Sequence, residues 1–196
     1  PLAVEGDDRV LHPNSEREES IVLRYLQGRD QTPHEQAATR VLAQWLETPF
    51  YQRLRTEEQL GYVVNAGYFP LLEAPGIAMV VQSPDADSET IAERMDAFLE
   101  EADERLAKLD DGELDAYRQA VNSRLSQRDT GLGQMANRYW QATALDDVRF
   151  DRREQLAELA LEVTLDELQA LWPALRDSQL DVRFNPGDAP SDVAEI

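Results

Sequence analysis

Two apolar runs separated by a short connection constrain the fold of this chain more than any other feature. Residues 62–69 (YVVNAGYF) and 77–83 (IAMVVQS) are rich in the β-branched and aromatic residues that favour strands. The connecting residues 70–76 contain two prolines and a glycine, so the chain turns there. We predict two neighbouring antiparallel strands, joined by a loop that is longer than a tight hairpin turn and could project.

Two further segments alternate in the way that strands do. Residues 20–27 place apolar side chains on both faces, which is typical of a strand that is covered on both sides. Residues 179–184 alternate Leu180, Val182 and Phe184 and predict a last strand that returns to the sheet. With helical patterns between them, this order predicts an α+β two-layer sandwich, a mostly antiparallel sheet with helices packed on one face. We expect one domain over residues 1–196, with an ordered core of about residues 18–185.

The segment before the first apolar run is predicted to be helical. Thr32 is a suitable N-cap, Pro33 suits the first helical position, and Glu35 would complete a capping box. Pro49 should interrupt this helix, because proline lacks the N–H that continues the helical hydrogen bonds. We therefore predict a second short helix over residues 50–60, with Gly61 as its C-terminal cap.

The second half of the chain is predicted to be mostly helical. A long helix begins at about Ser88, and capping pairs mark three later helix starts: Asp110 with Glu113, Asp151 with Glu154, and Thr164 with Glu167. Another helical pattern covers residues 134–145. Three tryptophans fall on apolar helical faces, so we expect all of them in the core: Trp45, Trp140 and Trp172.

The net charge of −20 excludes some classes of partner. Such a surface repels nucleic acid and anionic membranes, and no apolar run is long enough to cross a membrane. The acidic residues fit an ordinary solvated surface of the kind that a salty habitat favours; the alternative is an acidic wall that attracts cationic peptides. The absence of cysteine excludes disulfides and thiolate metal sites. Neither His12 nor His34 has a second histidine at zinc-binding spacing, so we expect no metal site here.

Arg55 and Tyr62 are the candidate functional residues. They lie on either side of Gly61, where a loop should become a strand. A guanidinium and a phenol at the mouth of a sheet can hold a carbonyl oxygen or an oxyanion. In the alternative reading Arg55 only pairs with Glu58 and Tyr62 only packs.

The segment that carries these two residues resembles a known family. Residues 49–64, PFYQRLRTEEQLGYVV, are similar to the C-terminal region of the pitrilysin and insulin-degrading-enzyme (insulinase) family of zinc metalloproteases. Residues 76–83, GIAMVVQS, resemble the strand that follows in that family, and the similarity extends over most of residues 20–184. The core Leu-Arg-Thr-x-Glu-Gln-Leu-Gly-Tyr is the most specific part.

The resemblance implies a place for this chain within a larger enzyme. Members of the family carry four similar domains around a closed chamber, and the first domain binds zinc through a His-x-x-Glu-His motif. The fourth binds no zinc, and the residues that match Arg55 and Tyr62 reach the substrate near the metal. The resemblance therefore implies a C-terminal fragment of a zinc metalloendopeptidase, without a cofactor of its own, inactive when isolated, and partnered by the remaining domains and a peptide substrate. Bacterial relatives suggest the periplasm. The alternative is a peptide-binding domain of a non-catalytic family member or partner subunit.

Overall fold

The computed structural model describes residues 10–11, 18–144 and 150–186 of the chain. Its strands are β1 (Val10–Leu11), β2 (Ser20–Gln27), β3 (Val63–Tyr68), β4 (Gly76–Ser83) and β5 (Gln179–Phe184). Its α-helices are α1 (Pro33–Tyr51), α2 (Ser88–Ala107), α3 (Asp111–Ser126), α4 (Leu132–Ala144), α5 (Arg152–Glu162) and α6 (Leu165–Asp177). A π-helix, η1 (Gln52–Glu57), directly follows α1.

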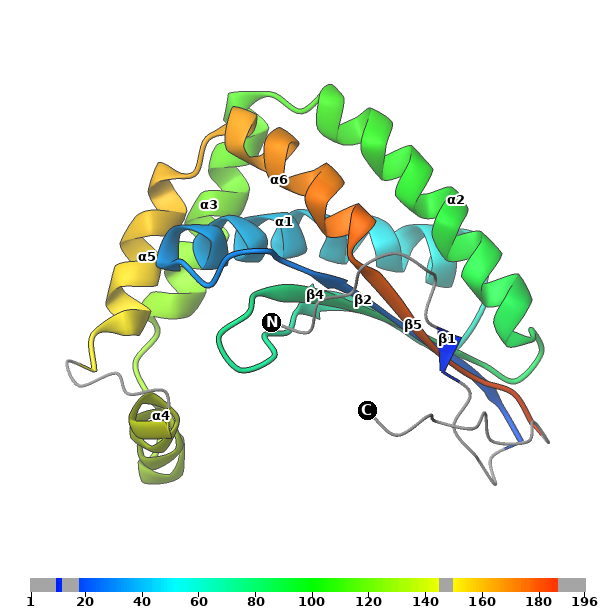
Figure 1. The fold of residues 1–196 in the computed structure, drawn as a ribbon, viewed down its shortest axis with the longest axis horizontal. Helices are drawn as coiled ribbons and strands as arrows, with labels where there is room; N and C mark the ends of the chain where they lie inside the picture. Colours follow the sequence, from blue (N-terminus) through cyan, green and yellow to red (C-terminus); the bar gives the residue numbers. More distant parts are fainter. Residues whose placement is uncertain (1–9, 12–17, 145–149, 187–196) are drawn as a thin grey trace.

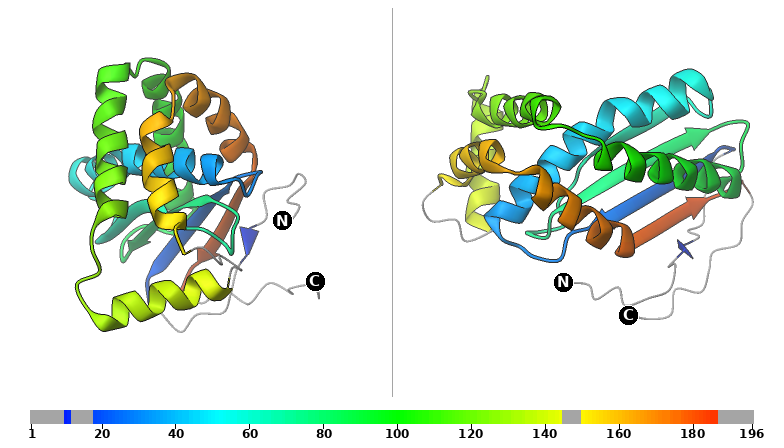
Figure 2. Two further views of the ribbon diagram at one scale, coloured as in Figure 1. Left: turned by 90° about the vertical axis from the view of Figure 1, so that its left-hand side faces the viewer. Right: turned by 90° about the horizontal axis from the view of Figure 1, so that it is seen from above.

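The strands form one sheet in the order β1-β5-β2-β4-β3. β2 pairs antiparallel with both β4 and β5, β3 pairs antiparallel with β4, and the short β1 runs parallel to β5. The α-helices pack on one face of this sheet, except for α4, which lies apart from the helical layer (Figures 1 and 2). The predicted α+β two-layer architecture and its mostly antiparallel sheet are confirmed.

The core lies between the sheet and the helices. Val22 and Leu26 of β2 and Ala66 of β3 are buried there together with apolar residues of α1, α2 and α6. Trp45 of α1 and Trp172 of α6 are both buried and meet edge to face, with ring centroids 6.2 Å apart. This contact joins the first helix, α1, to the last, α6, so the core depends on residues that are far apart in the sequence.

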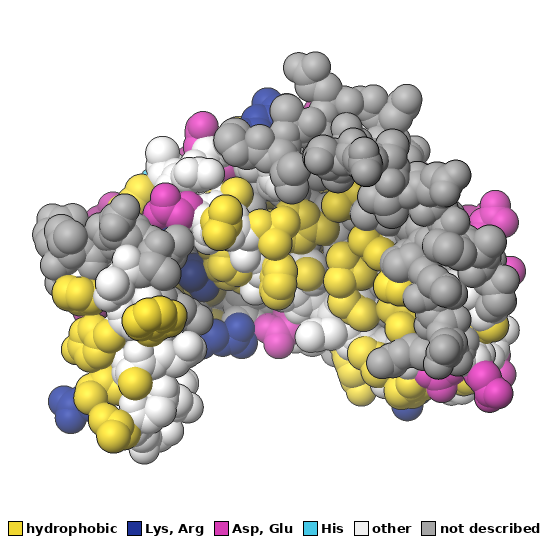
Figure 3. Space-filling view, turned by 60° about the horizontal axis from the view of Figure 1, so that its bottom comes forward, with side chains coloured by type: hydrophobic (Ala, Val, Ile, Leu, Met, Phe, Trp, Pro, Cys, Tyr) yellow, Lys and Arg dark blue, Asp and Glu magenta, His cyan; other side chains and the backbone are white. Residues whose placement is uncertain are grey.

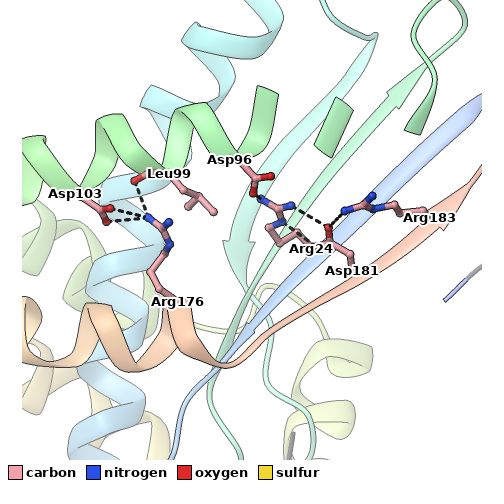
Figure 4. A network of polar contacts seen from close by, with 7 residues as sticks. All are labelled: Arg24, Asp96, Leu99, Asp103, Arg176, Asp181 and Arg183. Atoms are coloured by element: carbon pink, nitrogen blue, oxygen red, sulfur yellow. Dashed lines mark hydrogen bonds and ion pairs between the residues drawn. The ribbon is translucent and has the colours of Figure 1, made fainter. Parts of the chain in front are cut away.

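A hydrogen-bonded ion cluster ties α2 to the sheet (Figure 4). Arg24 of β2 is fully buried, and its Nε and Nη2 donate to the two oxygens of Asp181 on β5 at 2.8 and 2.9 Å. Its Nη1 donates to Asp96 of α2, and Arg183 also donates to Asp181 at 2.9 Å. A buried guanidinium needs such partners because an uncompensated charge in the core is strongly unfavourable.

The prediction that Pro49 ends the first helix is wrong. α1 continues through Pro49 to Tyr51, and the chain then widens into η1, in which the Glu58 N–H donates to the Arg53 carbonyl at 3.1 Å. Burial explains this, because Phe50 is fully enclosed and stacks edge to face on Phe98 of α2 at 5.2 Å. Tertiary packing here outweighs the lost helical hydrogen bond. The extra residue of the π-helix re-aims the chain before β3.

Gly61 is not a helix cap, contrary to the prediction. The left-handed conformation at the end of η1 belongs to Gln59, which has a φ of 54°. Gly61 is required for a different reason. A Cβ at this position would lie 2.1 Å from the backbone oxygen of Gln82 on β4, so only glycine lets the two backbones approach.

The connection between β3 and β4 folds back on itself. Leu71 and Ala74 exchange backbone hydrogen bonds of 3.0 and 3.1 Å, and Leu72 at the tip is exposed with a φ of 56°. Gly76 begins β4 where the ring of Tyr25 leaves no room, since a Cβ there would lie 2.1 Å from the Tyr25 hydroxyl oxygen. The predicted loop is therefore a compact turn held by its own backbone.

Three of the four predicted N-caps form, since the side chains of Thr32, Asp110 and Thr164 each accept a backbone N–H, whereas the predicted cap at Asp151 is wrong because its side chain makes no cap hydrogen bond to α5. Thr32 caps α1 by accepting from the Glu35 N–H at 3.2 Å, but the Glu35 carboxylate accepts from the N–H groups of Arg29 and Asp30 rather than from Thr32. The predicted capping box at α1 is thus incomplete. At α6 it is complete, since Thr164 and Glu167 satisfy each other's backbone N–H groups.

Trp140 is not a core residue, contrary to the prediction. Its side chain in α4 is 74% exposed. Leu132, Met135 and Tyr139 of the same helix are also exposed, so α4 presents an apolar face. The periodicity identified the apolar side of this helix correctly, but sequence periodicity does not show whether another element covers that side.

Candidate functional site

Tyr62 stands at one end of the edge strand β3. Its backbone N–H donates to the Gln82 carbonyl at 3.1 Å, which aligns the residue beside β4. The side chain is 51% exposed, so the phenol is not a core packing group. Its hydroxyl donates a hydrogen bond to the Glu19 carboxylate.

The Glu19 carboxylate is a shared acceptor at this site. The side-chain amide of Gln82 donates to the same oxygen, Oε2, that accepts from Tyr62. The strand register explains the grouping, because Gln82 lies opposite both Ile21 of β2 and Val63 of β3. Sequence reasoning missed Glu19 and Gln82, and only the order of the strands brings Glu19, just before β2, close to Tyr62.

Arg55 lies in η1, on the other side of the Gln59–Gly61 connection. The Leu60 N–H donates to the Leu54 carbonyl at 2.9 Å, and the buried Leu54 side chain anchors η1 in the core. This hydrogen bond folds the connection back, so that Arg55 and Tyr62 flank the same turn at one end of the edge strand.

The alternative partner of Arg55 is engaged elsewhere. Glu58 forms ion pairs with Arg53 at 3.3 Å and with Arg94 at 3.8 Å. Among the residues that the structure describes, no carboxylate pairs with Arg55. The two sequence candidates therefore offer a cation without a carboxylate partner and a half-exposed phenol, both of which can donate hydrogen bonds to a carbonyl oxygen.

No cluster of three or more His, Cys, Asp or Glu side chains suited to a metal ion occurs within residues 10–11, 18–144 and 150–186. His34 is partly exposed, and its Nε2 lies 2.8 Å from Oε1 of Glu167. The hydrogen bond from the backbone N–H of Thr164 lowers the pKa of Glu167, and the hydrogen bond with His34 lowers it further. His12 lies outside the described residues. No helix within these ranges is both long and apolar enough to cross a bilayer.

Residues 41–140 match the family described as PQQ synthase PqqF-like, C-terminal lobe domain 4. Similar proteins include the coenzyme PQQ synthesis protein F of Pseudomonas protegens, 38% identical over 55% of this chain and 13% of the relative. The corresponding protein of Pseudomonas aeruginosa is 33% identical over 74% of this chain and 18% of its own length. The insulin-degrading enzyme of Drosophila melanogaster is 28% identical over 80% of this chain and 16% of the enzyme. The chain thus spans less than a fifth of the length of these relatives.

Solved structures show the same fold. A crystal structure of pitrilysin matches 96% of this chain and 20% of its own, with a TM-score of 0.79 and 23% identity. The periplasmic protease PqqL from Escherichia coli matches 92% of this chain and 21% of its own, with a TM-score of 0.62 and 16% identity. An inactive peptidase domain of a putative zinc protease from Bordetella parapertussis matches 91% of this chain and 98% of its own, with a TM-score of 0.70 and 18% identity. The sequence matches and this shared fold place the chain in one family: it belongs to the pitrilysin and insulin-degrading-enzyme family of zinc metalloproteases, as a C-terminal domain.

Proposed function

We propose that this domain closes the substrate chamber of a zinc metalloendopeptidase and supplies Tyr62 and Arg55 to the bound peptide. One observation carries the proposal: a half-exposed phenol, and a guanidinium with which no described carboxylate pairs, flank one turn at the end of the edge strand. In this proposal zinc and its water belong to another domain of the same polypeptide and supply the attacking nucleophile. The remaining domains and a peptide are therefore the partners.

The two side chains have separate roles in this proposal. Negative charge develops on the carbonyl oxygen of the scissile bond, and the Tyr62 hydroxyl donates to it. Arg55 holds a backbone carbonyl or assists at the same oxygen, since all of its polar atoms are donors. Tyrosine has one O–H, which in this structure donates to Glu19, so the phenol must leave Glu19 before it can bind a substrate carbonyl.

Closure of the domains would complete such a site. A donor on this domain reaches a metal on another only when the two approach, and the approach also excludes water. The isolated 196-residue chain should then lack peptidase activity. Chelator-sensitive hydrolysis by the isolated chain would contradict the proposal.

The test uses the full-length polypeptide and a fluorogenic peptide, with and without zinc. Tyr62→Phe should lower kcat by roughly 10²–10³-fold, because loss of one oxyanion donor removes about 2.7–4 kcal/mol of transition-state stabilisation. Tyr51→Phe is a matched control, since Tyr51 is 50% exposed in the same region of the chain. Both variants should unfold at nearly the wild-type temperature. An unchanged kcat in Tyr62→Phe would remove Tyr62 from the reaction.

A second candidate is a peptide-binding domain in a non-catalytic family member or partner subunit. The similarity to a solved structure described as an inactive peptidase domain favours it. The upstream part of the gene discriminates the two, because an active enzyme needs an intact His-x-x-Glu-His motif. We also propose a periplasmic location, supported by the similar fold of a protein described as a periplasmic protease.

A further inference from the structure

The sheet face opposite the helices carries an apolar groove. It has a volume of about 350 Å³. Hydrophobic side chains gather on this face in the space-filling view (Figure 3). The groove is lined by side chains of four strands and of the residues after β3, among them Leu23, Tyr25, Asn65, Phe69, Val80 and Leu180. A groove of this size accepts one or two apolar side chains, and Asn65 adds a polar group that can bind a backbone.

A smaller cavity adjoins the groove across the edge of β3. Gly67 and Tyr68 line both spaces, and the small cavity is completed by residues of α1 and α3. Its volume of about 40 Å³ has room for a group of the size of a carboxylate. β3 is the last strand in the sheet order and has β4 as its one strand neighbour in the described structure. The two spaces therefore meet where the backbone of an edge strand is available.

The small cavity is lined by Arg40, which forms no ion pair with a carboxylate in the described part of the chain. Arg40 of α1 lies over the Tyr68 ring, with its Cζ 3.8 Å from the ring centroid, and its Nε is buried without a hydrogen-bond acceptor. The other cations nearby are paired, Arg124 with Glu47 at 3.4 Å and Arg152 with Glu73 at 2.7 Å. No ion pair joins Arg40 to any residue that the structure describes.

Arg40 differs from the exposed arginines because its buried Nε has no acceptor and no described carboxylate pairs with it. With 39 acidic and 19 basic residues, carboxylates are abundant, yet none reaches Arg40 in the described structure. Burial lowers the pKa of Arg40. Tyr68 raises it in part, and the charge of the nearby Arg152 lowers it again. A carboxylate in the cavity would satisfy the Nε donor and offset this unfavourable burial. Glu47 also lines the cavity, but its charge is paired with Arg124, so the charge of Arg40 is left to attract an anionic group.

Gly67 lies where the groove and the small cavity meet. A Cβ built on Gly67 meets no atom within 4 Å, so the packing of this domain does not require glycine there. In a strand, such a glycine often marks the close approach of another backbone. Gly61, before β3, differs from Gly67, because a Cβ on Gly61 would collide with the backbone oxygen of Gln82.

We propose that the sheet-face groove and Arg40 form a second peptide-binding site, which holds a peptide C-terminus: apolar side chains in the groove and the free carboxylate on Arg40. The choice of a peptide as ligand rests on the proposed function and on the open edge of β3, which can pair with a peptide backbone. Tyr68, over which Arg40 lies, is six residues along the chain from Tyr62, roughly 20 Å at the rise of a strand. The end of the site that binds the carboxylate is therefore separate from Tyr62 and Arg55.

The experiment measures binding of acetyl-Ala-Leu-Phe-Leu to the 196-residue chain by isothermal titration calorimetry without zinc. The solved Bordetella parapertussis domain matches this fold over 98% of its own chain, so a domain of this size forms the fold alone. The free acid should bind at least about tenfold more tightly than its C-terminal amide, as expected for hydrogen bonds to a charged group. In the Arg40→Gln variant, the free acid and the amide should bind with equal affinity. Arg29→Gln, with the same charge change on an exposed side chain, should preserve the difference.

A glycine pair tests the groove independently of charge. Gly67→Ala should weaken the binding of both peptides without lowering the unfolding temperature. Gly133→Ala is the control, because its added Cβ also meets no atom within 4 Å, and this variant should bind both peptides as tightly as the wild type. Equal binding of acid and amide, a difference that survives Arg40→Gln, or no binding would overturn the site. Displacement of the peptide by an equal concentration of decanoate would overturn the peptide assignment. Because this assay involves no hydrolysis, its failure is distinguishable from failure of the Tyr62 proposal.

Discussion

Asp181→Asn tests whether the buried cluster around Arg24 holds the sheet and α2 together. The change keeps the size of the side chain but removes the charge that receives two hydrogen bonds from Arg24, at 2.8 and 2.9 Å. Arg24 would then be a fully buried cation whose remaining ionic partner, Asp96, is more than half exposed. Breaking one side of a buried pair costs about 3–5 kcal/mol, and because Asp96 remains we expect about 3 kcal/mol.

Urea and thermal unfolding of the 196-residue chain provide the assay. A loss of about 3 kcal/mol should lower the melting temperature by roughly 6–12 °C for a domain of this length. The control is the double variant Arg24→Met with Asp181→Leu, which removes both charges and should be more stable than Asp181→Asn. A single variant that loses less than about 1 kcal/mol, or a double variant less stable than the single, would refute the reasoning.

The same cluster predicts sensitivity to acid. Burial alone would raise the pKa of Asp181, but hydrogen bonds and charge from Arg24 and then Arg183 bring it below its usual value. The folded state therefore binds the Asp181 proton more weakly than the unfolded state. The stability from this group is fully present above the unfolded pKa and is lost as the pH falls through the folded one. Asp181→Asn should flatten the stability profile below pH 4 or so; a profile parallel to wild type would contradict this.

Three further variants test local features by urea unfolding. Gly61→Ala should destabilise the domain by at least about 1–3 kcal/mol, because the Cβ would lie 2.1 Å from the Gln82 carbonyl oxygen; wild-type stability would show that β4 can shift. Thr164→Ala should lose about 1 kcal/mol with the capping box to Glu167, and no loss would mean that the α6 cap is redundant. Trp140→Ser should change stability by no more than about 0.5 kcal/mol, and a larger loss would mean that α4 packs on the domain.

The correct parts of the fold prediction rest on short-range patterns. Strands β2 and β5 were predicted from alternation over residues 20–27 and 179–184, and both occupy those ranges. The cap at Thr32 and the capping box at Thr164 form within four residues of sequence. Such features depend on neighbours along the chain, so the sequence alone contains the information.

The wrong predictions share a different cause. Pro49 should stop a helix in isolation, but the burial of Phe50 against Phe98 carries α1 past it. Gly61 was predicted to cap a helix, but glycine is needed there because the backbone of Gln82 lies too close for a Cβ. Trp140 lies on an apolar face that nothing described here covers. In each case the deciding contact, or its absence, involves an element distant in the sequence.

For the candidate site too, some residues could be identified from the sequence and others only from the structure. The motif around Arg55 and Tyr62 was recognisable from residues 54–62 alone, and their part in a reaction remains a prediction. Glu19 joins Tyr62 only because β4 lies between β2 and β3. Arg40 could not be distinguished from other helical arginines until α1 placed it over Tyr68.

By itself, the sequence determined the family through the resemblance of residues 49–64 and 76–83. It also determined the fold class and most helix and strand positions, because local propensity and hydrophobic periodicity act over a few residues. The tertiary structure alone decided that Arg24 is buried between Asp96 and Asp181, that α4 leaves its apolar face exposed, and that no carboxylate among the described residues pairs with Arg40. The physical reason is that burial and charge pairing depend on which distant segments meet, and the sheet order determines those meetings.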